Sequence, residues 1–365
     1  MKIAFAHDWL NGMRGGERCL EALCEVYPQA TIYTLLHEQG NLSPALSRMR
    51  IQTSFVQKLP LAFKKYRHYL PLFPTAIEQF DLRGYDLVVS LSHCVAKGVL
   101  TGPGTCHICY ILTPMRYAWD LYQDYFGGKK IHGLRKWIVP FLINYLRTWD
   151  AASSNRVDYF IAISEHVARR VRKYYRRECE VIYPPVDTQF YTPGSGDGDY
   201  FLIVSAFAPY KRIDLAIEAF NRLKLPLKII GKGQEEKALK RLAQGHIEFL
   251  GTLPDQEVRD YYRKCRALIF PGEEDFGLTP LEAQATGRPV IAYARGGALE
   301  TVVEGVTGLF FPEPTVESLC QAVQRFEHLN FEKSKIRDQA LRFSKERFKQ
   351  EMKVYIEGKV KEYFS

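Results

Sequence analysis

The 365-residue sequence predicts an α/β protein of two domains, each with a parallel β-sheet covered by helices. Three observations predict this class. Short apolar runs alternate with amphipathic helical patterns, the alternation restarts near residue 200 after a stretch rich in Pro, Gly and Asp, and the length exceeds that of one ordinary core. We expect an N-terminal domain over residues 1–190, a C-terminal domain over 191–345, and a helix over 346–365 that packs back on the N-terminal domain.

The N-terminal half is expected to contain strands at 3–6, 31–35, 86–93, 106–112 and 159–164. A turn with Gly15 and Gly16 follows the first strand and leads into a helix, which would expose unpaired backbone N–H groups to a ligand. A plain connection is the alternative. His93 and Arg116 follow two other strands and are cleft candidates, the alternative for His93 being a hydrogen-bonded structural residue.

The C-terminal half is expected to contain strands at 200–205, 227–230, 247–250 and 267–270, separated by helices. Lys211 and Arg212 open the helix that follows the first of these strands. Two cations beside the N–H groups of a helix start suit a diphosphate, because they neutralise negative charge without a metal.

A second loop, after the strand at 267–270, carries acidic side chains. Glu273, Glu274 and Asp275 lie in it, and Glu282 faces back toward it from a helix that begins at about Thr279. Carboxylates accept hydrogen bonds from sugar and ribose hydroxyls, so a diphosphate site beside this loop suggests a nucleotide sugar as ligand.

Composition narrows the class of protein. Hydrophobic residues make up 46% and charged residues 25%, and no apolar run is long enough to span a membrane or act as a signal peptide, which predicts a cytoplasmic protein. The eight scattered cysteines predict buried thiols in a reducing compartment. Cys106 and Cys109 form the only C-x-x-C pair, without the second ligand pair that zinc would need, so we expect no metal.

The basic excess lies in the N-terminal half, where residues 1–190 carry 24 Lys and Arg against 16 Asp and Glu. Two segments there, 54–76 and 129–149, mix basic with aromatic residues. Such segments suit an anionic membrane surface or single-stranded nucleic acid, the alternative being amphipathic helices that pack inward. Of these partners we expect the membrane and not nucleic acid.

The acidic stretch Glu274-Asp-Phe-Gly-Leu-Thr-Pro-Leu-Glu282, with the following Gly287, Pro289 and Gly296-Gly297, resembles the signature of the retaining glycosyltransferases of family 4, which have the GT-B fold. The resemblance covers nearly the whole chain. The segment Thr113-Pro-Met-Arg-Tyr-Ala-Trp-Asp120 resembles that of a subgroup containing mannosyltransferases and related hexosyltransferases of polysaccharide and O-antigen assembly. The resemblance to the family implies two Rossmann-like domains whose parallel sheets face each other across a cleft.

The resemblance also implies roles for individual residues. Glu274 would lie near the donor hexose, Glu282 would bind the ribose hydroxyls, and Lys211 would bind the diphosphate. Gly15 and Gly16 would form a glycine loop that closes over the diphosphate, with Asp8 just before it. Further donor contacts would come from backbone N–H groups of the segment Phe276, Gly277, Leu278 and Thr279.

Two positions depart from the family pattern. Ala206 replaces an arginine of the diphosphate site, for which Arg212 is the candidate substitute, and Leu112 replaces a histidine that contacts the donor sugar in relatives. His93 is the candidate substitute for that histidine.

The expected function is metal-independent, cofactor-free transfer of a hexose from a UDP- or GDP-sugar to a glycan acceptor, lipid-linked at the cytoplasmic face of a membrane. The alternatives are a GT-B nucleotide-sugar epimerase, a synthase with a soluble acceptor, and a non-catalytic sugar-nucleotide-binding protein.

Overall fold

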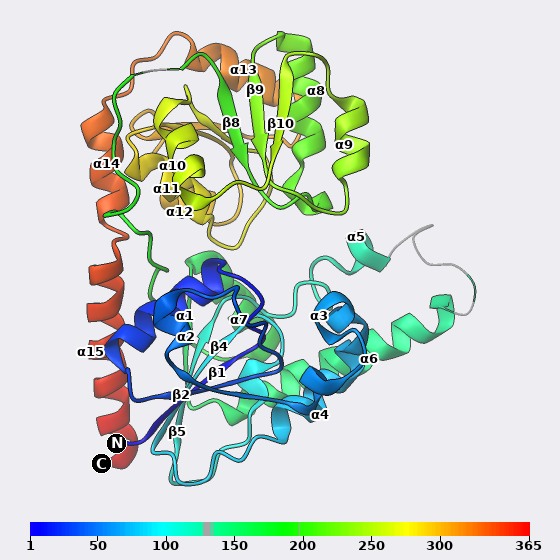
Figure 1. Cartoon of the computed structure of the whole chain (residues 1–365), viewed down its shortest axis with the longest axis vertical. Helices are drawn as coiled ribbons and strands as arrows, with labels where there is room; N and C mark the ends of the chain where they lie inside the picture. The colour runs from blue at the N-terminus through cyan, green and yellow to red at the C-terminus, as the bar shows by residue number, and fades with distance from the viewer. Residues whose placement is uncertain (127–132, 134, 197) are drawn as a thin grey trace. The chain divides into compact units, whose positions relative to one another are not determined.

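The computed structural model describes residues 1–126, 133, 135–196 and 198–365. The chain forms two compact units, the first made of residues 1–185 and 348–365 and the second of residues 186–347. Each unit is built around one parallel sheet with helices packed on it (Figure 1). The predicted α/β class with two Rossmann-like domains is therefore confirmed.

The sheet of the first unit has seven strands in the order β3-β2-β1-β4-β5-β6-β7. All paired neighbours are parallel. The strands are β1 Ile3–His7, β2 Thr31–Thr34, β3 Arg50–Thr53, β4 Leu87–Ser92, β5 Cys106–Ile111, β6 Tyr159–Ala162 and β7 Glu180–Val181. The strand order reverses between β1 and β4, and open α/β sheets bind ligands beyond the carboxyl ends of the strands at such a point.

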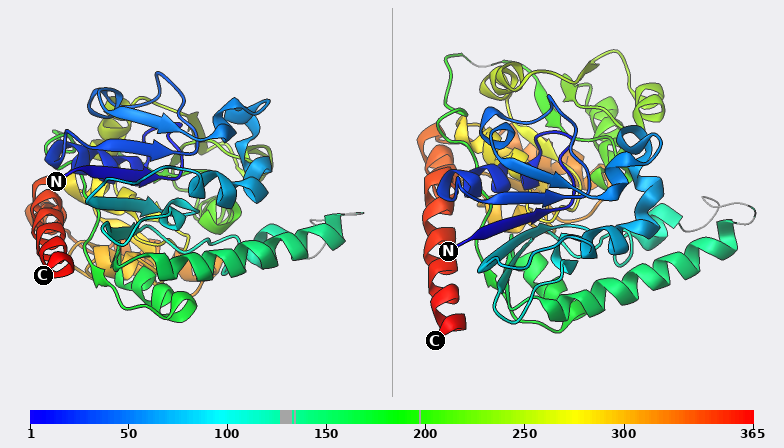
Figure 2. Two further views of the ribbon diagram at one scale, coloured as in Figure 1. Left: turned by 90° about the horizontal axis from the view of Figure 1, so that it is seen from below. Right: turned by 60° about the horizontal axis from the view of Figure 1, so that its bottom comes forward.

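Helices of different lengths join these strands. The α-helices are α1 Gly15–Val26, α2 Pro44–Ser47, α3 Ala62–Lys65, α4 Phe73–Glu78, α5 Tyr122–Phe126, α6 Arg135–Ser153 and α7 Glu165–Tyr175, and the 3-10 helices are η1 Phe55–Lys58, η2 Tyr66–Leu72, η3 Ala96–Gly98 and η5 Ser154–Arg156. Helix α6 runs out beyond the strands of its own unit (Figure 2). One end of α6 is thus free of the sheet.

The sheet of the second unit has six parallel strands in the order β10-β9-β8-β11-β12-β13. They are β8 Phe201–Val204, β9 Leu227–Ile230, β10 Ile247–Gly251, β11 Leu268–Phe270, β12 Val290–Tyr293 and β13 Gly308–Phe311. This is the same order as in the first unit, with the reversal between β8 and β11. The repeated order explains why the sequence shows two similar α/β halves.

The helices of the second unit are η6 Pro209–Lys211, α8 Ile213–Leu223, α9 Glu236–Leu242, α10 Asp255–Lys264, α11 Leu278–Ala285, α12 Ala298–Thr301, α13 Val316–Phe326 and α14 Lys333–Leu341. One hydrophobic core joins the sheet to α8 and α13 through buried side chains such as Phe201, Phe220 and Leu319. Helices α8 and α13 are strongly amphipathic, with one apolar face toward this core.

The last helix, α15 Lys345–Phe364, begins in the second unit and packs on the first from Phe348 onward. The buried Phe348 ring meets Tyr110 of β5 edge to face at 5.6 Å between centroids. Lys349 pairs with Glu25 of α1 at 3.0 Å. These contacts attach the end of the chain to the N-terminal unit.

All eight cysteines are free, and seven of them are buried. No helix in the described ranges is both long and apolar enough to cross a membrane.

Candidate functional site

The carboxyl ends of β8 and β11 lie side by side because these two strands pair in parallel, with Leu202 opposite Leu268. The loop after β8 leads through η6 to Lys211, and the loop after β11 carries Glu274. The strand order therefore brings the predicted cationic and acidic loops together at the point of reversal of the second sheet.

Lys211 and Glu274 form a direct ion pair between Nζ and Oε2. Their side chains are only 14% and 19% exposed, so water screens the pair less than it would at an open surface. The two half-buried loops thus hold an ammonium and a carboxylate together. The ammonium of Lys211 suits a phosphate, and the carboxylate of Glu274 suits a hydroxyl.

The loop that carries Glu274 is held in place by close backbone packing. The amide of Gly297 donates to the carbonyl of Glu274 at 2.8 Å. A Cβ at Gly297 would lie 2.2 Å from Cα of Phe276, so only glycine permits this approach. The Phe276 side chain is itself buried, 5.8 Å from the Phe343 ring. The acidic loop is thus positioned before any ligand binds.

Helix α11 begins at the end of this loop. Gly277 is its N-cap residue, and Leu278 and Thr279 form its first turn, so their N–H groups lie at the positive end of the helix. Further along the helix, the half-buried Glu282 accepts a hydrogen bond from the Tyr262 hydroxyl at 2.9 Å. Tyr262 lies on α10, and no local pattern in the sequence connects it with Glu282.

Arg212 does not join the Lys211–Glu274 pair in the structure. It is the N-cap residue of α8, and its Nε pairs with Asp214 of the same helix at 3.2 Å. Ala206, at the other family position of interest, lies exposed after β8. Of the two predicted cations, only Lys211 therefore pairs with the acidic loop in the structure.

In the first unit, Asp8 follows β1 and is completely buried. Its carboxylate accepts four backbone hydrogen bonds, from the amides of His93, Cys94, Val95 and Ala96, at 2.6–3.0 Å. Burial would raise the pKa of Asp8, but the charge and hydrogen bonds of His93 hold it well below its usual range. Asp8 thus fixes the loop that carries His93.

His93 is the other member of this pair, with its Nδ1 3.0 Å from Asp8 and 29% of its side chain exposed. Burial would lower the pKa of His93, yet the neighbouring Asp8 carboxylate raises it above its usual value. His93 is therefore a candidate hydrogen-bond donor at the carboxyl edge of the first sheet.

Gly15 and Gly16 are the first residues of α1, the helix that follows β1 in the chain. A Cβ at Gly16 would lie 2.8 Å from Leu112 and 3.3 Å from the ring of His7. His7 is fully buried, and its Nε2 lies 3.9 Å from Oε1 of Glu17. Neither ring nitrogen of His7 makes a hydrogen bond. Glycine at position 16 allows α1 to start against this histidine and against Leu112.

Sequence reasoning missed His7 and Glu17 as members of this cluster. Burial would raise the pKa of Glu17, but its interaction with His7 lowers it. The one available signal was that His7 ends the first strand, next to Asp8, where α/β sheets place functional side chains.

A second missed feature is a buried ion pair behind the His93 loop. Lys97 Nζ lies 2.6 Å from Asp150, and both side chains are fully buried. The second oxygen of Asp150 accepts from Trp119 at 2.8 Å and from Tyr175 at 2.9 Å. Because Asp150 accepts three hydrogen bonds from side chains and Lys97 also donates to Ser153 Oγ, the pair can be kept inside the protein.

Two family models match the chain, one for each half. The model described as "Glycosyltransferase Family 4" matches residues 13–190, and the model described as "Glycosyl transferases group 1" matches residues 189–343. The chain belongs to the family 4 glycosyltransferases. The resemblance inferred from the acidic motif is thereby confirmed.

Curated relatives match parts of the chain. An uncharacterized glycosyltransferase of Methanocaldococcus jannaschii is 31% identical over 184 residues, which are 49% of this chain and 52% of the relative. The O-antigen chain mannosyltransferase C of Escherichia coli is 31% identical over 133 residues, 34% of this chain and 36% of the relative. The chain thus spans about half or less of the length of these relatives.

A solved structure matches nearly the whole chain. The Anabaena protein HepE in complex with UDP-glucose has a TM-score of 0.71 at 16% identity, covering 98% of this chain and all of that chain. At 16% identity the match shows a shared fold and nothing about function. Together with the two parallel sheets, it identifies the predicted GT-B fold.

Among the described residues, no group of three or more His, Cys, Asp and Glu side chains is arranged to hold a metal ion.

The variant Asp8→Asn tests the role of Asp8 in the first unit. The substitution removes a negative charge that interacts with four backbone amides and with His93. It should lower the free energy of unfolding at pH 7 by about 3 kcal/mol. Because the folded pKa of Asp8 is depressed, its contribution is fully present above pH about 4 and is lost as the pH falls through the folded pKa. The variant should therefore lose less stability below pH 4 than the wild type.

Chemical denaturation across this pH range measures both effects. The matched control is Asp338→Asn, at an exposed position of α14. Equal stability of Asp8→Asn and wild type at pH 7 would contradict the assigned role.

Proposed function

We propose that the protein is a retaining glycosyltransferase that transfers a hexose from a UDP- or GDP-sugar to a glycan acceptor. The observation that carries the proposal is the Lys211–Glu274 pair, at the reversal point of the second sheet and beside the start of α11. A cation and helix N–H groups suit a diphosphate, and the neighbouring carboxylates suit hydroxyls.

In the proposed step, the bond between the hexose C1 and the diphosphate oxygen breaks while the acceptor oxygen bonds to C1 on the same face. The acceptor proton passes to the departing diphosphate. Lys211 stabilises the charge that develops on this leaving group, and Arg212 would add to it after release from Asp214. Glu274 would hold hexose hydroxyls and Glu282, already oriented by Tyr262, those of the ribose.

We also propose that the reaction needs neither a metal nor a cofactor, because Lys211 and the first N–H groups of α11 can stabilise the diphosphate. For the first unit, we propose that Gly15 and Gly16 at the start of α1 and His93 at the carboxyl edge of the sheet take part in substrate binding.

Donor choice is tested by thermal shift with UDP- and GDP-hexoses, followed by transfer of labelled hexose in EDTA. One donor should raise the melting temperature by mass action, and its hexose should appear on an acceptor. Lys211→Gln should lower kcat by about 100-fold with little change in melting temperature. The matched control Lys237→Gln, exposed on α9, should be fully active.

Other outcomes of this experiment favour other functions. Label that stays in a changed nucleotide sugar would indicate an epimerase, and label that reaches only a soluble acceptor would indicate a synthase. Donor binding without turnover on any acceptor would indicate a binding protein, and activity abolished by EDTA would contradict metal independence.

We further propose that the acceptor is lipid-linked and that the first unit docks on an anionic membrane. Helix α6 packs Val139 and Leu142 on the unit's core, yet its outer side leaves apolar side chains open to solvent. These are Trp137 (74% exposed), Ile138 (53%), Phe141 (77%) and Tyr145 (45%). Large exposed aromatic side chains on one helix are typical of an interfacial surface.

The segment 54–76 adds charge to this unit. It forms η1, α3, η2 and α4, whose inner side chains belong to the same core as α6. Its outer side chains include Leu61 and Phe63 and four exposed cations, Lys58, Lys64, Lys65 and Arg67. Of the basic residues predicted in 129–149, Lys129 and Lys130 lie outside the described residues. Anionic headgroups complement such cations.

Vesicle flotation with phosphatidylglycerol tests this surface. Trp137→Ser/Phe141→Ser should reduce the bound fraction at least about tenfold, since both rings would leave the interface. The control Leu341→Ser/Val354→Ser removes two exposed apolar side chains from α14 and α15 and should bind normally. Equal binding of both variants, or no flotation of the wild type, would contradict the proposal.

A further inference from the structure

A cavity of about 570 Å³ opens on the first unit at the amino ends of β1, β2 and β3. Its lining includes Ile3 and Thr31, where β1 and β2 begin, and Arg50, where β3 begins. The candidate residue His7 ends β1 and Asp8 follows it, roughly 13 Å from Ile3 along the strand. The cavity is therefore separate from the candidate residues at the carboxyl edge of the same sheet.

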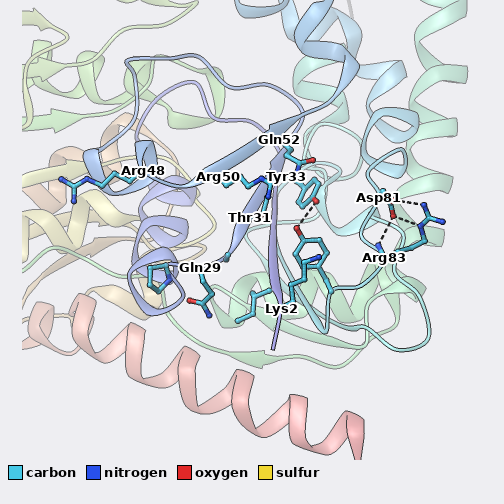
Figure 3. Close-up of a pocket in the computed structure, with 13 residues that line it drawn as sticks. Lys2, Gln29, Thr31, Tyr33, Arg48, Arg50, Gln52, Asp81 and Arg83 are labelled. Atoms are coloured by element: carbon cyan, nitrogen blue, oxygen red, sulfur yellow. Dashed lines mark hydrogen bonds and ion pairs between the residues drawn. The ribbon is translucent and has the colours of Figure 1, made fainter.

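Positive charge dominates the lining of this cavity. Its basic side chains are Lys2, Arg48, Arg50 and Arg83, against the single carboxylate of Asp81. Figure 3 shows Arg83 with Asp81 on one side, Arg48 on the other, and Lys2 and Arg50 between them. The net charge of the lining favours an anion.

The cations differ in how they are paired. Arg83 is neutralised by two side-chain hydrogen bonds of 2.8 Å to Asp81. Neither Arg48 nor Arg50 has an ion-pair partner within the described part of the chain. A guanidinium without a carboxylate keeps its fork of N–H donors for a bidentate anion.

The floor of the cavity is polar and ordered. The hydroxyls of Tyr33 and Tyr85 lie 3.1 Å apart, and both residues are buried. Lys2 Nζ lies 4.5 Å from the centre of the Tyr85 ring. A ligand that enters the cavity would meet two hydroxyls and an ammonium held in defined positions.

The positive charges of the lining act on the Tyr85 hydroxyl at the floor of the cavity. Burial acts to raise the pKa of Tyr85, but hydrogen bonds with Thr31 and Tyr33 lower it. The charges of Lys2 and Arg50 lower it further, and the resulting pKa is below the usual value. The same charges would stabilise a bound anion.

We propose that this cavity is a second anion site of the protein and binds a phosphorylated ligand. Arg50 and Lys2 contact the phosphate oxygens, Arg48 adds long-range attraction, and the tyrosine hydroxyls bind the remaining oxygens or a neighbouring sugar hydroxyl. The volume accommodates a group of the size of a sugar phosphate or a diphosphate. The phosphate can belong to a soluble molecule or to a lipid headgroup.

Calorimetric titration with inorganic pyrophosphate tests the site. The titration is made in a Lys211→Gln background, so that the proposed donor site does not contribute. Lys2→Gln/Arg50→Gln should raise the Kd at least about tenfold, because two charged hydrogen-bond donors are lost. Both positions are exposed, so the fold should be retained, and circular dichroism checks this.

The matched control is Lys237→Gln/Arg241→Gln, which removes the same charge from the exposed face of α9. It should bind pyrophosphate as its parent does. Flotation with vesicles containing phosphatidic acid distinguishes the two sources: a loss in the Lys2/Arg50 variant indicates a lipid headgroup, and unchanged flotation a soluble phosphate. Equal Kd values for the two double variants, or no pyrophosphate binding by the parent, would overturn the proposal.

Discussion

The parallel pairing of β8 with β11 is the constraint on which the candidate donor site depends. It places two loops that are more than 60 residues apart in sequence at one edge of the sheet, and so brings Lys211 to Glu274. The close approach of Gly297 then fixes the acidic loop from the other side. Neither loop could hold its charged side chain in this position alone.

The first unit uses the same strand order for a different local chemistry. Pairing of β1 with β4 places the end of β1 beside the loop after β4, where the buried Asp8 carboxylate binds four successive amides. The second unit has a half-buried ion pair at the equivalent point, whereas the first has a satisfied carboxylate and two histidines. The same strand order thus holds an ion pair at the reversal point of one sheet and a buried carboxylate with four amide hydrogen bonds at that of the other.

The sequence predicted the two-domain α/β fold and the proximity of Lys211 to Glu274, because strand ends, loops and helix starts leave local patterns. It did not predict the Lys97–Asp150 pair, whose members are 53 residues apart and carry no shared motif. The edge strand β3 was missed because Arg50–Thr53 is polar and half exposed. The 129–149 segment was recognised as basic and aromatic, but which side of α6 faces solvent is decided by packing on the core.

The central claim, that a nucleotide sugar binds at the reversal point of the second sheet, is tested most directly by hydrogen–deuterium exchange. Exchange is measured with and without the nucleotide sugar that raises the melting temperature. The account predicts slower exchange of the backbone amides of residues 276–279, at the loop end and the first turn of α11, because the donor would cover them. Unchanged exchange there, with protection confined to other parts of the protein, would contradict it.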